Sequence, residues 1–233
     1  MSPNEEPCMT VNSISKDQES LTNNIAQEPD NELRIKPISF TMLYTLQAGD
    51  YRLSEVGFII IDDGWSENSL LDLKHKTGLG TLFALQTTDK LINKFEVIDG
   101  IIICESDEVE QVMTVFESVL SVQDKVGIDV NDIKRSCGAE KSAKFIQTTV
   151  MGAADSEQLE TAVNHLLNQI PEGLSIEYMM LDIESDHKLS LDEFFIVITA
   201  IESRIADDAE VFYGNRMVDK PDHCWVGAMY VAG

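Results

Sequence analysis

The sequence predicts an α/β to α+β fold. Residues 38–104 contain short apolar runs separated by turn residues, which is typical of buried strands with connecting helices. One strongly amphipathic helix follows near residue 109. From there to the end, strand-like and helix-like segments follow one another as β-α-β-α-β-β. We therefore expect a small α/β layer, a long central helix and an α+β sandwich of two helices on one sheet.

Residues 1–36 are rich in Asn, Ser, Gln, Glu and Pro and show no apolar period. They carry too little apolar surface to offset the entropy lost on ordering, so a flexible acidic tail is predicted. Residues 37–104 are predicted to form the α/β layer. Its expected strands are Phe40–Leu46, Phe58–Ile61, Leu82–Leu85 and Ile101–Cys104, with helices at Glu67–Leu73 and Asp89–Phe95.

Residues 105–126 are predicted to form the central helix. Asp107 lies at its start, where a carboxylate suits the positive end of the helix dipole. Gly127 is expected to end it. The apolar side chains that share one face at helical spacing are Val109, Val112, Met113, Phe116, Val119 and Leu120.

Residues 127–233 are predicted to form the C-terminal domain. Ser190 and Glu193 match the S-x-x-E capping box, which marks the start of a helix. The other expected elements are helices near Asn131–Cys137 and from Asp155, and strands at Lys144–Met151, Ile176–Ile183, Ala209–Tyr213 and Cys224–Ala232.

Charge and hydropathy argue against several classes of partner. The chain has 41 acidic and 17 basic residues and a net charge of −24, which repels nucleic-acid phosphates and anionic lipid. No apolar run approaches the ~20 residues needed to span a bilayer, and no secretory signal opens the chain. The four cysteines form no C-x-x-C pair, so neither a disulfide framework nor a zinc site is indicated. We expect a cytoplasmic protein whose partner is another protein.

Four short segments share their order and spacing with one known family. They are Asp107–Val109, Leu191–Phe194, Ala209–Asn215 and Trp225–Gly233. In turn they resemble the ADEV, LDEF, ATVVIGT and RVTVVATG motifs of FtsZ, a cell-division protein of the tubulin superfamily. The resemblance covers residues 105–233 and implies the FtsZ central helix and C-terminal domain. Residues 37–104 would then correspond to a reduced N-terminal domain.

The resemblance also implies that the nucleotide site is missing. In FtsZ a GGGTGTG loop cradles the phosphates through its backbone N–H groups, and no such loop occurs here. Only Gly78 and Gly80 lie close together, and a lone G-x-G is more typical of a turn. Asp107 falls on the family's base-recognising Asp. These three residues are the candidates for nucleotide binding, and neither GTP turnover nor a bound cofactor is expected.

Asp129 and Asp132 fall on the two acidic positions of the FtsZ synergy loop. In that family the loop reaches the next subunit's nucleotide and helps to position the attacking water. Gly127 stands where the family has Asn, which removes one polar contact. The resemblance therefore implies a surface for contact with another subunit at these three residues, without efficient hydrolysis.

One segment matches a different motif, the calcium loop of an EF-hand. Oxygen-bearing side chains stand at its ligand positions, which are Asp182, Glu184, Asp186, Ser190 and Glu193. His187 stands where the loop requires Gly, and no second loop occurs. The same residues fit a polar turn between a strand and a capped helix.

Taken together, these patterns favour protein–protein interaction in cell division or filament regulation, with FtsZ or a second copy as partner and no enzymatic activity. A chain with the synergy-loop face but no nucleotide face would cap a filament end. Two alternatives stay open at this point. One is a polymerising FtsZ-type GTPase with a divergent site, and the other is a calcium-binding module.

Overall fold

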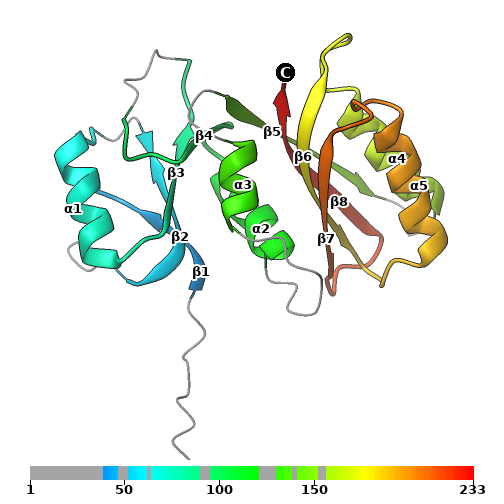
Figure 1. Cartoon of the computed structure of the whole chain (residues 1–233). Coiled ribbons are helices and arrows are strands. Elements are labelled where there is room, and N and C mark those ends of the chain that lie inside the picture. The colour runs from blue at the N-terminus through cyan, green and yellow to red at the C-terminus, as the bar shows by residue number, and fades with distance from the viewer. Residues whose placement is uncertain are drawn as a thin grey trace, which may run out of the picture. The chain divides into compact units, whose positions relative to one another are not determined.

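The computed structural model describes residues 39–46, 52–61, 64–89, 95–120, 130–137, 141–151 and 156–233. Their strands form one eight-stranded sheet in the order β1-β2-β3-β4-β5-β8-β6-β7 (Figure 1). The strands are β1 (Ser39–Tyr44), β2 (Ser54–Ile60), β3 (Thr81–Gln86), β4 (Gly100–Ile103), β5 (Ser142–Met151), β6 (Ile176–Ser185), β7 (Glu210–Met217) and β8 (His223–Ala232). The helices are α1 (Glu67–Thr77), α2 (Val109–Leu120), α3 (Val130–Ser136), α4 (Ser156–Leu167) and α5 (Leu191–Glu202).

Strands β1 to β5 run parallel, so their carboxyl ends share one edge of the sheet. The central strands β2 and β3 are buried on both faces, as the continuous apolar runs of a parallel sheet require. At the carboxyl edge, Gln86, Ile103 and Lys144 stand side by side in register across β3, β4 and β5. This alignment brings residues that follow different strands close together.

The last part of the sheet mixes directions. Strand β8 lies between β5 and β6 and is antiparallel to both, while β6 and β7 are parallel. The chain order there is β5-α4-β6-α5-β7-β8. The fold is therefore mixed α/β, as the sequence predicts, with one mostly parallel sheet that runs through both the predicted α/β layer and the predicted C-terminal domain. None of the described helices is long and apolar enough to cross a membrane.

Helices cover both faces of the sheet, because successive side chains of a strand point to opposite sides. On β6, Tyr178 and Met180 pack into the core that contains α2. Met179 and Leu181 pack into the core that contains α4 and residues of α5. Phe116 of α2 lies at the centre of the first core, with ring centroids 5.0 Å from those of both Phe58 and Phe83.

Several elements differ from their predicted bounds. Strand β6 continues two residues past Ile183, because Glu184 finds an ionic partner in Arg216 on β7. The apolar pattern that follows Ser190 continues to Ile205. Helix α5 nevertheless ends at Glu202, since Ser203 caps its last turn by donating to the Ala200 carbonyl at 2.6 Å.

The described part of the central helix, α2 (Val109–Leu120), is shorter than the helix predicted over residues 105–126. Residues 105–108 form a turn and not the first turn of the helix, because the Glu108 side chain accepts a hydrogen bond from the Glu105 N–H at 2.8 Å. Residues 121–126 of the predicted helix lie outside the described residues. So do residues 90–94, which make up most of the helix expected at Asp89–Phe95.

Candidate functional site

Two acidic positions singled out in the sequence lie at opposite edges of the parallel strands. Asp107 follows the carboxyl end of β4, in the turn before α2. Asp132 lies on α3, whose Lys134 donates a hydrogen bond of 2.6 Å to the carbonyl of Gly80, directly before β3. Because β3 and β4 are parallel, residues that precede them and residues that follow them lie at different edges. We call these the amino edge, with α3, and the carboxyl edge, with Asp107.

The amino edge is held together by Asp99, the residue directly before β4. Its Oδ2 atom accepts hydrogen bonds of 2.8 Å from Lys74 on α1 and from the Leu82 N–H, and its Oδ1 atom lies 3.2 Å from Nζ of Lys134. Burial raises the pKa of the Asp99 carboxyl, but the hydrogen bonds and the two lysine charges outweigh burial and lower it. Asp99 is therefore ionised near neutral pH and joins α1, β3 and α3.

Asp132 lies partly exposed on α3. Its side chain is 24% exposed and forms an ion pair with Arg135, three residues later on the same helix. Ile133 is fully buried in the core, so packing sets which side of α3 faces outward. The other two predicted contact residues, Gly127 and Asp129, lie outside the described residues.

Gly78 and Gly80 form a turn at the amino edge. Gly78 ends α1 in the left-handed conformation (φ 66°), and its N–H donates to the Lys74 carbonyl at 2.9 Å. Gly80 leads directly into β3. Both glycines are thus at the opposite edge from Asp107, so the structure does not bring the three nucleotide candidates together.

A concavity of about 330 Å³ lies at the carboxyl edge. Parallel α/β sheets bind their ligands at such edges. Its lining residues come from the ends of β3 and β4 and the segments that follow them, from β5 and from the turn after α4. They include Gln86, Thr87, Thr88, Asp89, Cys104, Glu105, Glu108, Lys144 and Gln169. Three of these are carboxylates and one is a lysine. Both carboxylate oxygens of Glu108 already have partners, because they accept hydrogen bonds from the Glu105 N–H at 2.8 Å and from Gln147 at 2.9 Å.

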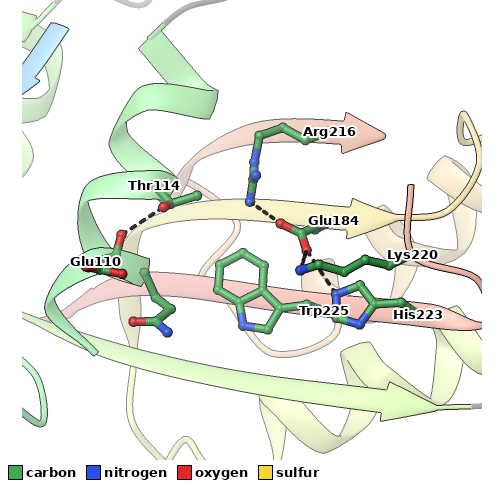
Figure 2. A pocket seen from close by; sticks show the side chains of 8 residues that line it. Glu110, Thr114, Glu184, Arg216, Lys220, His223 and Trp225 are labelled. Carbon is green, nitrogen blue, oxygen red and sulfur yellow. Dashed lines mark hydrogen bonds and ion pairs between the residues drawn. The ribbon is translucent and has the colours of Figure 1, made fainter. Parts of the chain in front are cut away.

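A second concavity, of about 240 Å³, lies between α2 and strands β6 to β8 (Figure 2). Its centre is Glu184, whose carboxylate meets Arg216, Lys220 and His223, each at 3.0 Å. Burial raises the pKa of Glu184, but these partners outweigh burial and lower it. The Arg216 guanidinium also lies 5.9 Å from the centre of the Trp225 ring. The basic side chains of this concavity thus already have a carboxylate partner within the chain.

Behind this concavity, Asp182 carries a carboxylate with no exposed surface. Its two oxygens accept hydrogen bonds from Ser118 on α2 at 2.5 Å and from Nε of Arg216 at 2.8 Å. Burial raises the pKa of Asp182, and these two partners offset only part of that effect. Gly214 leaves the room for this network, since a Cβ there would lie 2.4 Å from the Ser118 Oγ.

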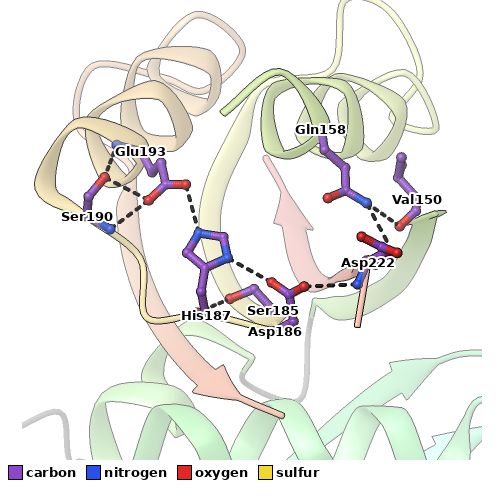
Figure 3. Close-up of polar contacts among 8 residues, drawn as sticks. All are labelled: Val150, Gln158, Ser185, Asp186, His187, Ser190, Glu193 and Asp222. Carbon is purple, nitrogen blue, oxygen red and sulfur yellow. Dashed lines mark hydrogen bonds and ion pairs between the residues drawn. The ribbon is translucent and has the colours of Figure 1, made fainter. Parts of the chain in front are cut away.

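The EF-hand interpretation is wrong in its geometry. Ile176–Ser185 is a β strand, whereas an EF-hand loop follows a helix. Asp182 and Glu184 are used within the sheet, as just described. Asp186 accepts a hydrogen bond from the N–H of Asp222, and Ser190 and Glu193 form the predicted capping box at the start of α5 (Figure 3). Among the described residues, no group of three or more His, Cys, Asp or Glu side chains could hold a metal ion.

His187 joins the loop before α5 to that helix (Figure 3). Its Nδ1 atom lies 2.9 Å from Asp186 and its Nε2 atom 2.8 Å from Glu193. Hydrogen bonds to these two carboxylates raise the pKa of His187. Asp186 in turn accepts a hydrogen bond of 2.9 Å from the N–H of Asp222, in the turn between β7 and β8. The imidazole therefore joins the loop before α5 to the first turn of that helix, and Asp186 extends the connection to the distant turn between β7 and β8.

Sequence reasoning missed the roles of Ser118, Arg216 and His187, and it noted His187 only as a departure from the calcium loop. One local signal was available for the first two, because Asp182 interrupts the apolar run of β6 and a buried carboxylate requires partners. Which residues would supply them depends on contacts across 64 and 34 positions of the chain. No spacing rule predicts such contacts.

Comparison with known proteins shows a relationship in structure only. No protein-family model matches the sequence, and neither does any curated protein. A W319Y mutant of FtsZ from M. jannaschii matches with a TM-score of 0.55 and 14% identity, over 77% of this chain and 66% of that one. An empty FtsZ dimer from M. jannaschii matches with a TM-score of 0.51 and 13% identity, over 77% of this chain and 64% of that one.

CetZ from Methanosaeta thermophila strain DSM 6194 also matches, with a TM-score of 0.46, 16% identity and coverage of 77% of this chain and 62% of that one. The chain spans slightly less than two thirds of the length of each FtsZ chain, at 66% and 64%. At these identities the two FtsZ matches establish a common fold.

Proposed function

Because the chain has the fold of the FtsZ structures, we propose that it is a tubulin-like cytoskeletal or cell-division protein. It acts through contact with a filament subunit, either FtsZ or a second copy, and not through its own nucleotide turnover. The observation that supports this proposal is that Asp132 and Asp107 lie at opposite edges of the parallel strands.

Head-to-tail stacking of subunits requires two contact surfaces at opposite ends of each subunit. Subunits that stack in one direction present one edge to the subunit below and the other edge to the subunit above, and growth continues only if both edges bind. The amino edge presents the Asp132 carboxylate, and the sequence resemblance adds Asp129 and Gly127 to the proposed contact. A chain whose second edge does not bind a nucleotide stops growth after one contact, so it caps a filament.

The composition of the carboxyl edge supports the absence of nucleotide turnover. A triphosphate needs cations or a run of backbone N–H groups. Among the residues that the structure describes, the lining of the concavity at this edge holds three carboxylates, Asp89, Glu105 and Glu108, and one lysine, Lys144. The glycines that could form a phosphate loop, Gly78 and Gly80, lie at the other edge.

A polymerising GTPase with a divergent site is the second candidate. The concavity at the carboxyl ends of β3 and β4 favours it, because this is where parallel sheets bind nucleotides. Guanine nucleotide that stays bound through purification, or phosphate release that rises with protein concentration, would support this candidate over the first.

The test adds trace amounts of the full chain to an FtsZ from the same cell and follows light scattering and filament length. The wild type should shorten filaments at amounts far below those of FtsZ. The double variant Asp129→Ala/Asp132→Ala should lose this effect, whereas Asp107→Ala, at the other edge, should keep it. Unchanged polymer mass and length with the wild type, or inhibition only at equimolar amounts, rules capping out.

A further inference from the structure

Helix α5 is apolar around most of its circumference, yet one side of it is exposed. Only Val197 and Ile201 are buried, while Leu191 is 86% and Phe195 71% exposed. A helix that is apolar all round is normally covered on every side. Phe194 shows the contrast, since its ring packs edge-on against Tyr213 with centroids 5.2 Å apart. The outer side of α5 therefore has the composition of an interface.

A groove runs between this side of α5 and its neighbour α4, and the two helices contact each other directly. It encloses about 290 Å³, which is room for one large apolar side chain. We call it the α4–α5 groove; it is lined by Glu160 and Asn164 of α4 and by Phe195, Ile196, Thr199 and Ala200 of α5. Its floor is apolar, and a carboxylate stands on its rim.

The charge of the two helices defines what fits the groove. Neither α4 nor α5 contains Lys or Arg. Glu157, Glu160 and Asp192 are exposed, and none of them forms an ion pair with a described residue. A segment with an apolar side chain flanked by Lys or Arg would bury the apolar floor and pair with the rim.

Two occupants from the chain itself fit less well. A second copy would bring acidic helices against acidic helices. The N-terminal segment, residues 1–38, has 7 acidic residues against 3 basic ones, so it carries the same sign of charge as the rim. The groove therefore favours a different protein.

We propose that the α4–α5 groove docks a basic amphipathic helix of a partner protein. An apolar residue of that helix inserts beside Phe195, and its cations pair with Glu160 and Asp192. Ile133 of α3 packs into the core of α2, on the other face of the sheet from the core of α4 and α5. The groove is thus separate from the amino edge, and the proposal does not depend on the filament contact made there.

The test measures binding of the full chain to a synthetic amphipathic peptide, with Leu and Phe on one helix face and Lys on the other, by fluorescence anisotropy. Phe195→Ala and Glu160→Lys should each weaken binding, by about tenfold for Phe195→Ala. Met217→Ala is the matched control, since this side chain is 68% exposed on β7 and should change nothing. A peptide with Glu in place of Lys should not bind.

Several results would overturn the proposal. Equal binding of the Lys peptide by wild type, Phe195→Ala and Glu160→Lys would show attraction to the net charge alone. Binding that appears only after residues 1–38 are deleted would identify that segment as the occupant. A dimer in wild type that Phe195→Ala abolishes would identify a second copy. Filament capping should be unchanged in Phe195→Ala. Failure of the groove proposal can therefore be told apart from failure of the proposed filament contact at the amino edge.

Discussion

The hydroxyl of Ser118 on α2 donates a hydrogen bond of 2.5 Å to the fully buried carboxylate of Asp182 on β6. This contact connects the central helix to the part of the sheet in which strand directions are mixed, and Arg216 on β7 binds the second carboxylate oxygen at 2.8 Å. A buried carboxylate is costly unless its oxygens are satisfied. The position of α2 against β6 and β7 is therefore sensitive to each of these partners.

Ser118→Ala should lower the free energy of unfolding by about 1–3 kcal/mol, because it leaves one buried oxygen of Asp182 without its donor. Urea unfolding monitored by tryptophan fluorescence measures this. Thr114→Ala is the control. Thr114 lies one turn earlier on α2 and donates to the Glu110 carbonyl within its own helix, so its loss should change stability by less than about 0.5 kcal/mol. Equal effects of the two variants would contradict the prediction.

Gly214→Ala should also destabilise the protein, because the new Cβ would lie 2.4 Å from the Ser118 Oγ and 2.8 Å from Oδ1 of Asp182. Overpacking of this kind costs about 1–3 kcal/mol. Removal of the Ser118 hydroxyl takes away the closest of these contacts. A double-mutant cycle should therefore show that Gly214→Ala costs less in the Ser118→Ala background than in the wild type. Strict additivity would show that the two sites are independent.

Local patterns predicted much of this fold because they report local physics. Phe58 and Phe83 lie in apolar runs long enough only for strands, and both runs form buried strands. The pair Ser190 and Glu193 predicted the start of α5, and both capping hydrogen bonds are present. The insertion of β8 between β5 and β6 had no such signal, since strand order depends on contacts between distant residues.

The candidate site was predicted less completely for the same reason. Asp132 could be singled out by its resemblance to a family position, but its edge of the sheet follows from the contact of Lys134 with Gly80, across 54 positions. The calcium-loop interpretation of Asp182 and Glu184 failed because ligand spacing alone does not distinguish a loop from a strand. In β6 the alternate positions 182 and 184 share a face, where Arg216 contacts both.

His187 should make stability depend on pH near neutrality. Its pKa is raised by hydrogen bonds to Asp186 and Glu193, so the folded chain holds this proton more tightly than the unfolded chain. The stabilisation is complete below the unfolded pKa of about 6.5 and is lost as pH rises through the higher folded pKa. In His187→Asn, unfolding free energies measured across about pH 5–9 should lose this decline.

His165→Asn is the control for this measurement, because His165 is exposed on α4 and forms no ion pair with a described residue. It should keep the decline of the wild type. If His187→Asn and the wild type gave parallel curves, the imidazole would not be coupled to the two carboxylates.

Gly78→Ala should lower stability by about 1 kcal/mol, because Gly78 adopts a φ of 66° at the end of α1 and a Cβ there strains the backbone. No atom lies within 4 Å of that Cβ, so the strain comes from the backbone alone.

The wild type should not hydrolyse GTP, and Gly78→Ala should bind GTP analogues to the same extent as the wild type. Turnover that this substitution abolishes would identify the turn as a phosphate loop.

Asp99→Ala should destabilise the protein by about 1–3 kcal/mol and also weaken any contact made through α3. The carboxylate accepts hydrogen bonds from Lys74 and the Leu82 N–H and pairs with Lys134, so its loss removes one of the contacts that hold α3 at the amino edge. Because these partners lower the pKa of Asp99 despite its burial, its contribution is present above the unfolded pKa of about 3.9. It disappears as pH falls through the lower folded pKa.

The difference in stability between wild type and Asp99→Ala should therefore be large at pH 7 and shrink in strong acid. Asp72→Ala is the matched control. Asp72 forms an exposed ion pair with Lys76 on the same helix as Lys74, and such pairs contribute little. In the capping assay, Asp99→Ala should need a higher dose than Asp72→Ala for equal shortening of filaments, because α3, which carries Asp132, would be held by fewer contacts. Equal potency of the two variants at a temperature where both are folded would show that the amino-edge cluster does not position the contact surface.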